Sequence, residues 1–161
     1  MDMNNEKIDL QKLCAEHKDA LVSFELPEEQ AQFTALPKEV LETREGQFPV
    51  VITKDDYPVG FFILHTTERV KEFTENPTAM LLTALSITFS QQGKGYAWKG
   101  MALLQPFLKK EFPHCSELVL AVNRRNIAAQ KLYEKAGFQD TGRRIMGKKG
   151  EQYIYSYIIE R

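Results

Sequence analysis

Two glycines in a short turn are the residues whose spacing points most directly to chemistry. Residues 92–97 read Gln-Gly-Lys-Gly-Tyr-Ala, between the apolar run Leu81–Phe89 and a helical pattern. Such a turn leaves backbone N–H groups unpaired at a helix N-terminus, where they and the helix dipole favour an anion such as a pyrophosphate. Alone, the pattern is equally typical of a tight turn with no ligand.

A second informative segment begins at Asn126, about thirty residues further along the chain. Asn126 is a favoured N-cap residue, and Gly137 followed by Phe138 is typical of a Schellman-type helix end. The stripe predicted to be buried contains Ala129, Leu132, Tyr133 and Ala136. From this spacing alone, Asn126 is a helix cap and Tyr133 is a core tyrosine.

Together the two segments resemble the GCN5-related N-acetyltransferase (GNAT) family. Gln92-Gly93-Lys94-Gly95-Tyr96-Ala97 fits the family's acetyl-CoA signature, Arg/Gln-x-x-Gly-x-Gly/Ala. The segment from Asn126 to Phe138 is similar to the family's Asn…Ala…Leu-Tyr…Gly-Phe helix. The resemblance extends over Phe48–Ile159 in the order of elements, and it is specific in these two motifs.

The resemblance implies an α/β fold with a mixed, mostly antiparallel central sheet, helices on both faces, and a splayed strand pair that holds acetyl-CoA. In that family the pantetheine arm lies along a strand, here Leu85–Ile87, and a backbone N–H, here that of Ile87, binds the thioester oxygen. Tyr133 would be the general acid for the departing thiolate. The implied acetyl-CoA-binding residues are Leu85, Ser86, Ile87, Gln92, Gly93, Lys94, Gly95, Tyr96, Ala97, Trp98, Asn126 and Tyr133.

The implied activity is transfer of an acetyl group from acetyl-CoA to a primary amine, by direct attack in a ternary complex without a covalent acyl-enzyme. Some relatives carry a glutamate base five residues before the asparagine, where this chain has Ala121. Other candidate bases are Glu25, Glu28, Glu29 and His65, each of which is also typical of a surface or structural residue. A non-catalytic CoA-binding sensor is the alternative. A nucleotide-binding domain that uses only the glycine turn would leave the second segment unexplained.

Length and composition favour a single cytoplasmic domain. The chain has 161 residues, of which 43% are hydrophobic and 27% charged, with neither a membrane-length apolar run nor a signal-peptide pattern. We expect residues 1–47 to shape the acceptor side and residues 48–161 to form the acetyl-CoA-binding core. Cys14 and Cys115 are predicted to be free thiols, and with His17 and His114 they lack the spacing of a metal site.

Charge is divided unevenly along the chain. Residues 1–80 hold 8 Lys/Arg and 16 Asp/Glu, a balance of −8, whereas residues 81–161 hold 13 and 6, a balance of +7. This imbalance suits either a solvated surface of uneven charge, or a polyanionic ligand for the basic half and a cationic one for the acidic half. The second interpretation favours a small cationic acceptor, such as a polyamine or an aminoglycoside-like amine, with a peptide N-terminus or lysine side chain as an alternative. No motif indicates nucleic-acid binding. Family members often dimerise, so the resemblance allows a homodimer, although no exposed apolar stripe in the sequence identifies a surface for one.

Apolar periodicity and turn residues predict the order of elements. Pro106 should kink or end the first long helix, and Trp98 and Phe33 are core candidates. Lys148 and Lys149 suit either a phosphate contact or a solvated hairpin tip. Tyr153, Tyr155 and Tyr157 suit a packed sheet face or an aromatic pocket wall. The predicted strands are 8–13, 48–53, 57–66, 78–89, 118–122, 138–146 and 152–159, and the predicted helices are 15–24, 27–35, 37–45, 97–108 and 126–136.

Overall fold

One seven-stranded sheet runs through the protein. This computed structural model describes residues 6–39 and 44–160. The strands are β1 (Ile8–Lys12), β2 (Gln47–Lys54), β3 (Tyr57–His65), β4 (Ala79–Ile87), β5 (Glu117–Asn123), β6 (Gln139–Gly147) and β7 (Gly150–Ile158). Their order across the sheet is β1-β2-β3-β4-β5-β7-β6, and only β4 and β5 run parallel. The expected mixed, mostly antiparallel sheet is therefore confirmed.

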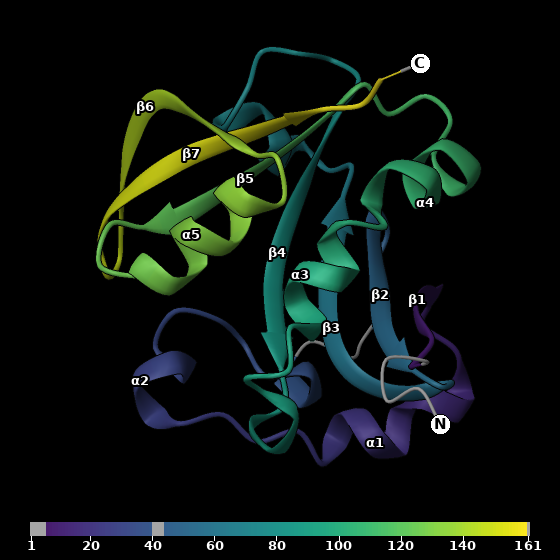
Figure 1. Cartoon of the computed structure of the whole chain (residues 1–161). Helices are drawn as coiled ribbons and strands as arrows, with labels where there is room; N and C mark the ends of the chain where they lie inside the picture. Colours follow the sequence, from purple (N-terminus) through teal and green to yellow (C-terminus); the bar gives the residue numbers. More distant parts are fainter. Residues whose placement is uncertain (1–5, 40–43, 161) are drawn as a thin grey trace.

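Helices lie on both faces of this sheet, as expected. The α-helices are α1 (Lys18–Val22), α2 (Glu28–Ala31), α3 (Tyr96–Met101), α4 (Leu104–Glu111) and α5 (Ile127–Lys135). The 3-10 turns are η1 (Ala15–His17), η2 (Pro37–Glu39), η3 (Glu68–Glu72) and η4 (Phe89–Gln91). Figure 1 shows α3, α4 and α5 in front of the sheet, while α1 packs against β3 from behind and α2 lies below α5. None of the described helices has the length and apolar character needed to cross a membrane.

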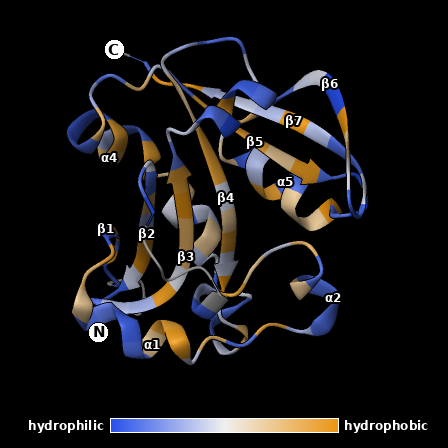
Figure 2. Cartoon of the chain, turned by 180° about the vertical axis from the view of Figure 1, so that it is seen from behind, coloured by the Kyte–Doolittle hydropathy of each residue, from blue (hydrophilic) through white to orange (hydrophobic). Residues whose placement is uncertain are grey.

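The core is divided by the sheet into one large and two smaller clusters. The large cluster lies beneath α3, α4 and α5 and includes Ile52, Phe62, Leu104, Leu118 and Tyr155. On the other face, one small cluster lies under α1 and the other under η3. Figure 2 shows hydrophobic residues along β3, β4 and β5, whereas the edge strand β6 is mainly hydrophilic.

Two predicted helices differ from the structure for identifiable reasons. The helix after the glycine turn breaks at Ala102 and Leu103, before Pro106, which then lies in the first turn of α4. Proline is tolerated there because the first-turn N–H groups have no partner within the helix. The N-terminal helical stretches are shorter than predicted, and part of the helix expected at 37–45 falls outside the described residues.

The tyrosines of β7 belong to the packed face of the sheet. Tyr155 is buried, and its hydroxyl donates a hydrogen bond to Glu134 at 3.2 Å. Tyr153 and Tyr157 are partly buried against the same cluster, and none of the three lines the large cavity beside β4 and β5. Of the two interpretations offered by their spacing, the structure supports the packed sheet face.

Candidate active site

β4 and β5 separate part-way along their length. They pair only where residues Ala79–Leu81 meet Glu117–Val119, and beyond that point no described strand lies between them. β4 also carries a bulge at Ala84, whose φ is 60°. A bulge bends its strand and increases the local twist. The two strands therefore leave an opening in the middle of the sheet, which is the splayed pair that was predicted.

A large cavity occupies this opening. Its volume is about 1350 Å³. It is lined by every residue of the predicted site except Lys94, namely Leu85, Ser86, Ile87, Gln92, Gly93, Gly95, Tyr96, Ala97, Trp98, Asn126 and Tyr133. The Lys94 ammonium instead donates to the side chain of Gln91 at 3.2 Å. The fold thus brings two sequence segments, about thirty residues apart, to the same cavity.

The ladder between β3 and β4 fixes the direction of the Ile87 amide. The Thr88 N–H donates to the Val59 carbonyl at 3.1 Å, and Ser86 pairs with Phe61. Because successive peptide groups in a strand point to opposite sides, the N–H and carbonyl of Ile87 face away from β3. Consistently, the Ile87 carbonyl accepts a hydrogen bond from the Gln92 side chain at 2.8 Å. The Ile87 N–H is therefore directed to the opening.

The glycine turn presents bare backbone to the cavity. Gly93 and Gly95 have φ values of 78° and 81°, and Gly95 is the N-cap of α3. A Cβ atom at either position would meet no atom within 4 Å. Glycine is thus required here for its left-handed conformation, while the space beside it is open. A phosphate-bearing ligand fits such a turn because N–H groups line it and no side chain fills it.

Two aromatic residues of α3 point in different directions. Tyr96 turns into the core, and its hydroxyl donates to Glu6 at 3.1 Å, so only its backbone can serve a ligand in the cavity. Burial of Tyr96 raises the pKa of its hydroxyl. Trp98 is 37% exposed, and the Lys135 ammonium lies 4.5 Å from its ring centroid. The expectation that Trp98 belongs to the core is wrong, because the inward positions of α3 are taken by Tyr96, Gly100 and Met101.

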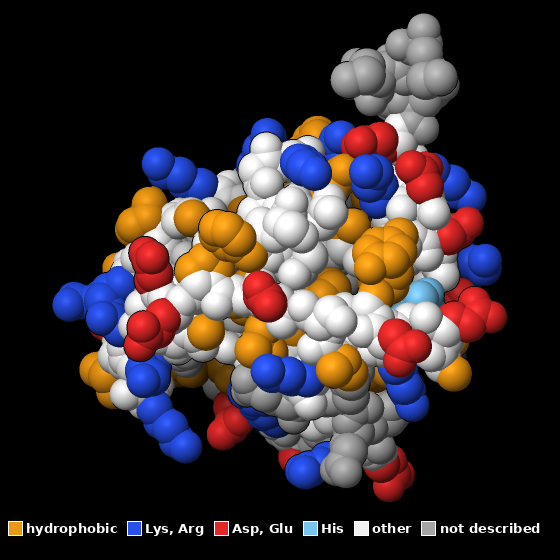
Figure 3. All heavy atoms as spheres, turned by 90° about the horizontal axis from the view of Figure 1, so that it is seen from below, with side chains coloured by type: hydrophobic (Ala, Val, Ile, Leu, Met, Phe, Trp, Pro, Cys, Tyr) orange, Lys and Arg blue, Asp and Glu red, His pale blue; other side chains and the backbone are white. Residues whose placement is uncertain are grey.

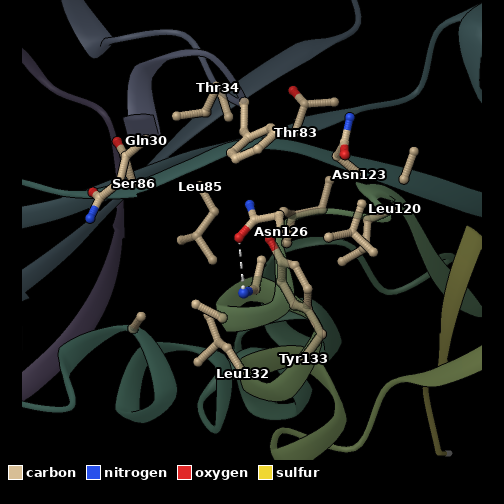
Figure 4. Close-up of a pocket in the computed structure, with 18 of the residues that line it drawn as sticks. Gln30, Thr34, Thr83, Leu85, Ser86, Leu120, Asn123, Asn126, Leu132 and Tyr133 are labelled. Carbon is tan, nitrogen blue, oxygen red and sulfur yellow. Dashed lines mark hydrogen bonds between the residues drawn. The ribbon is translucent and has the colours of Figure 1, made fainter. Parts of the chain in front are cut away.

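The helix α5 places Asn126 and Tyr133 at the cavity. The Asn126 side chain accepts the Ala129 N–H at 3.2 Å, which confirms the predicted cap. Tyr133 is buried against Phe138, with ring centroids 5.4 Å apart. Figure 4 shows Tyr133 rising from α5 into the cavity beside Asn126 and Leu120. Burial raises the pKa of the Tyr133 phenol well above its ordinary value, so the hydroxyl keeps its proton at neutral pH.

The wall facing α5 comes from the N-terminal segment, η3 and the β6–β7 hairpin. Gln30 and Gln92 exchange side-chain hydrogen bonds of 2.8 and 3.0 Å, which ties α2 to the glycine turn. The Arg125 guanidinium lies 5.7 Å from the Phe33 ring centroid and donates to the Lys149 carbonyl. The sequence did not indicate the other residues of this wall, which include Thr34, Arg69, Glu72, Phe73 and Thr83. Phe33 is only half-buried and lines the cavity rather than the core.

The candidate bases occupy different positions. Ala121 lines the cavity, and so does Glu29, whereas Glu25 and Glu28 do not. His65 lies behind the wall, with Nε2 2.6 Å from the Thr83 hydroxyl. Burial, and secondarily the charge of Arg69, lowers the pKa of His65 to about 4, so its ring is neutral at neutral pH. Lys148 and Lys149 are exposed at the hairpin tip and also line the cavity.

Comparison with known proteins decides the family. A family model described as "Acetyltransferase (GNAT) family" matches residues 10–138. The chain is a GNAT acetyltransferase. The resemblance inferred from the two motifs is thereby confirmed, and the match also includes most of the N-terminal segment, where the sequence showed nothing diagnostic.

Individual relatives agree with this assignment. An "Uncharacterized N-acetyltransferase YbbJ" of Bacillus subtilis (strain 168) is 50% identical over 148 residues, which cover 89% of this chain and 92% of that protein. The crystal structure of aminoglycoside acetyltransferase AAC(6')-Ib with coenzyme A and kanamycin has a TM-score of 0.74 and 18% identity, covering 94% of this GNAT chain and 95% of the other. An uncharacterized protein from Bacillus halodurans has a TM-score of 0.77 and 14% identity over 96% and 85% of the two chains. At such identities the two solved structures establish a shared fold.

Proposed function

We propose that this GNAT protein transfers the acetyl group of acetyl-CoA to a primary amine by direct attack within a ternary complex. One observation carries the proposal. The opening between β4 and β5 brings the Ile87 N–H, the bare glycine turn and the protonated Tyr133 to a single cavity. These are an oxyanion donor, an anion cradle and a proton donor, which are the groups that thioester aminolysis needs.

Each group has a separate role in this proposal. The backbone of Gly93–Trp98 would bind the pyrophosphate, and Asn126 would contact the pantetheine arm. The Ile87 N–H would bind the thioester oxygen and stabilise the negative charge that develops on it during attack. Tyr133 would donate to the departing thiolate. Both cysteines lie outside the cavity lining, and no covalent acyl-enzyme is required.

The opposite face of the opening would receive the amine. The glycine turn and α5 lie on the α3 side of the sheet, so a bound nucleotide would fill that side (Figure 1). The acceptor would approach between the N-terminal segment and the β6–β7 hairpin. This arrangement supports the proposal that residues 1–47 shape the acceptor side, because Glu29, Gln30, Phe33 and Thr34 form part of that wall.

Binding of the acetyl donor is the first property to test. Calorimetric titration with acetyl-CoA, CoA and ATP should give binding selective for the two CoA compounds. A thiol-release assay against a panel of primary amines should then give amine-dependent formation of CoA. Equal binding of ATP would contradict a CoA site. CoA binding without turnover of any amine would favour a non-catalytic CoA-binding protein, the alternative that Ala121 in place of a glutamate supports.

The pH dependence should report the acceptor rather than a base on the enzyme. An alkylamine attacks only when it is neutral, and Ala121 offers no carboxylate to remove its proton. His65 is neutral throughout the working range because its pKa is about 4. We expect kcat/KM to rise with pH as the free amine increases. No falling limb should appear below about pH 10, because the raised pKa of Tyr133 keeps it protonated beyond the ordinary range of tyrosine.

Two acceptors whose amines differ in pKa would test this directly. The midpoint of the rising limb in kcat/KM should shift with the acceptor by the same amount as the amine pKa. A midpoint that stays the same for both amines would show that an enzyme group is the base, and would contradict the proposal.

Charges on the cavity wall bear on how much positive charge the acceptor amine carries. The lining holds Arg69, Arg125, Lys148 and Lys149 against two acids, Glu29 and Glu72. Figure 3 shows acidic and basic side chains interspersed on the face seen from below. The acidic balance of the first half of the chain is therefore not concentrated at the cavity, and it supports a polycationic acceptor less than the sequence alone suggested.

We therefore propose a small primary amine of low positive charge as the acceptor. In a thiol-release assay, spermidine should have a kcat/KM no higher than that of a monoamine of similar length, because each further cation would meet the excess of Lys and Arg. A clear preference for spermidine, retained at physiological salt, would contradict this and restore the polyamine hypothesis.

A further inference from the structure

An unusual hydroxyl lies next to the proposed oxyanion donor. Ser86 is only 6% exposed and lines the cavity, yet its Oγ has no hydrogen-bond partner among the described residues. A buried polar group without a partner costs free energy, so most such groups in folded proteins are paired. Alanine would fit the apolar cluster on this face without that cost. A ligand that donates a hydrogen bond would account for serine here.

The bulge in β4 determines which way this hydroxyl points. Ser86 pairs with Phe61, and Thr83 pairs with Ile63, so all four side chains share one face of the sheet. Residues three apart would lie on opposite faces of a regular strand, but the extra residue at Ala84 brings them to the same face. That face is turned away from α3 and α5. Ser86 therefore lies on the side from which the acceptor would approach, one residue from the Ile87 N–H.

A second hydroxyl, contributed by the N-terminal segment, has the same property. Thr34 lines the cavity from the N-terminal segment, and its buried Oγ1 also has no partner among the residues that the structure describes. Figure 4 shows Thr34, Ser86 and Gln30 on the side of the cavity away from Tyr133 and Leu132. Thr83 differs from both, since its hydroxyl already bonds His65 at 2.6 Å. Among the serine and threonine hydroxyls of the described cavity lining, those of Ser86 and Thr34 therefore have no partner, whereas that of Thr83 has one.

We propose that Ser86 Oγ and Thr34 Oγ1 form the subsite for the acceptor's amino group, with Ser86 accepting an N–H from the attacking nitrogen. This inference rests on the proposed acetyl transfer. A neutral hydroxyl can orient an uncharged amine without the strong preference for the ammonium ion that a carboxylate would bring, so the nitrogen lone pair stays available. As the N–C bond forms and the C–S bond breaks, the amine releases a proton to water. The departing thiolate receives a proton from Tyr133, and solvent then reprotonates Tyr133.

The test compares full-length wild type with Ser86→Ala, Ser86→Thr and Thr34→Val, with Thr83→Val as the matched control. Hydroxylamine is the probe, because it is a minimal nucleophile that is largely uncharged at neutral pH and can reach the subsite without other contacts. Thiol release in excess of the enzyme-free reaction of hydroxylamine with acetyl-CoA gives kcat/KM for the probe, calorimetry gives the Kd for acetyl-CoA, and thermal unfolding gives Tm.

Ser86→Ala should lower kcat/KM for hydroxylamine about five- to tenfold, the loss of one neutral hydrogen bond, and leave the Kd for acetyl-CoA unchanged. Its Tm should be equal to or above that of wild type, because no protein hydrogen bond is lost. Thr34→Val should also lower kcat/KM for hydroxylamine. Ser86→Thr keeps a hydroxyl and should retain the wild-type kcat/KM. Thr83→Val should instead lower Tm, because Nε2 of the buried His65 ring would lose its hydrogen bond with the Thr83 hydroxyl.

Two results would overturn the subsite, and a third would overturn the proposed acetyl transfer as well. An unchanged kcat/KM in Ser86→Ala would remove this residue from the site. A lower Tm in Ser86→Ala, with activity lost in proportion to unfolded protein, would show that the hydroxyl is structural. If wild type binds acetyl-CoA but gives no thiol release above the enzyme-free rate with hydroxylamine or with any amine, the proposed function itself is rejected, and the subsite with it.

Discussion

Tyr133→Phe is expected to lower kcat about 10²- to 10⁴-fold at saturating acetyl-CoA and amine, the range typical of a lost general acid. The reason is local. The phenol lies in the cavity and keeps its proton because burial raises its pKa, so it is ready to donate wherever a thiolate forms beside it. The Phe variant retains the ring and its contact with Phe138, so the fold and the Kd for acetyl-CoA should change little.

Tyr155→Phe is the matched control for that experiment. Tyr155 is also a buried tyrosine with a raised pKa, but its hydroxyl bonds Glu134 and it lies outside the cavity lining. This variant should lose about 1 kcal/mol of stability and keep its turnover. Steady-state thiol release and calorimetry measure both variants. Equal turnover in Tyr133→Phe and wild type would dismiss Tyr133 as the acid.

Gly95→Val should weaken acetyl-CoA binding by more than about tenfold, which corresponds to about 1.4 kcal/mol. The space beside Gly95 is open, so the valine side chain would occupy the volume assigned to the pyrophosphate. Valine would also be strained at a φ of 81°. Strain alone could therefore mimic loss of a binding site, and the experiment needs a control that shares it.

Gly142→Val supplies that control. Gly142 has a φ of 84° and open space around it, but it lies in the edge strand β6 and does not line the cavity. Both variants should lower Tm by similar amounts, because both force a branched residue into a left-handed conformation. Only Gly95→Val should raise the Kd measured by calorimetry. Equal Kd values for the two variants would remove Gly95 from the binding site.

The sequence carried more information about the proposed donor side than about the proposed acceptor side. The glycine turn and the Asn126–Phe138 helix are local patterns, in which each residue's conformation follows from its immediate neighbours. The wall formed by Thr34, Arg69 and Thr83 is assembled from three separate segments by the sheet, and no short-range pattern marks such residues. The shared orientation of Thr83 and Ser86 was equally inaccessible, because it depends on a bulge at an ordinary alanine.

The position of the helix break before Pro106 also depends on more than the local sequence. Proline predicts that a helix is interrupted, but the position of the break depends on whether the proline can serve as a first-turn residue of a new helix. Here α4 begins two residues before it, so Met101 and Leu104 remain buried on either side of the break. Exposure of Trp98 follows from the same short α3, whose inward positions were already filled.

The bulge at Ala84 also limits how this strand can change in length. Removal of one residue between Thr83 and Ser86 would restore a regular strand, in which residues two apart share a face, so Ser86 would still pair with Phe61 and the Ile87 N–H would still face away from β3. The deletion would instead remove the bend and the added twist that the bulge gives β4 close to where β4 and β5 separate. Loss of one residue here should therefore narrow the opening between the two strands, whereas substitution at Ala84 should preserve it.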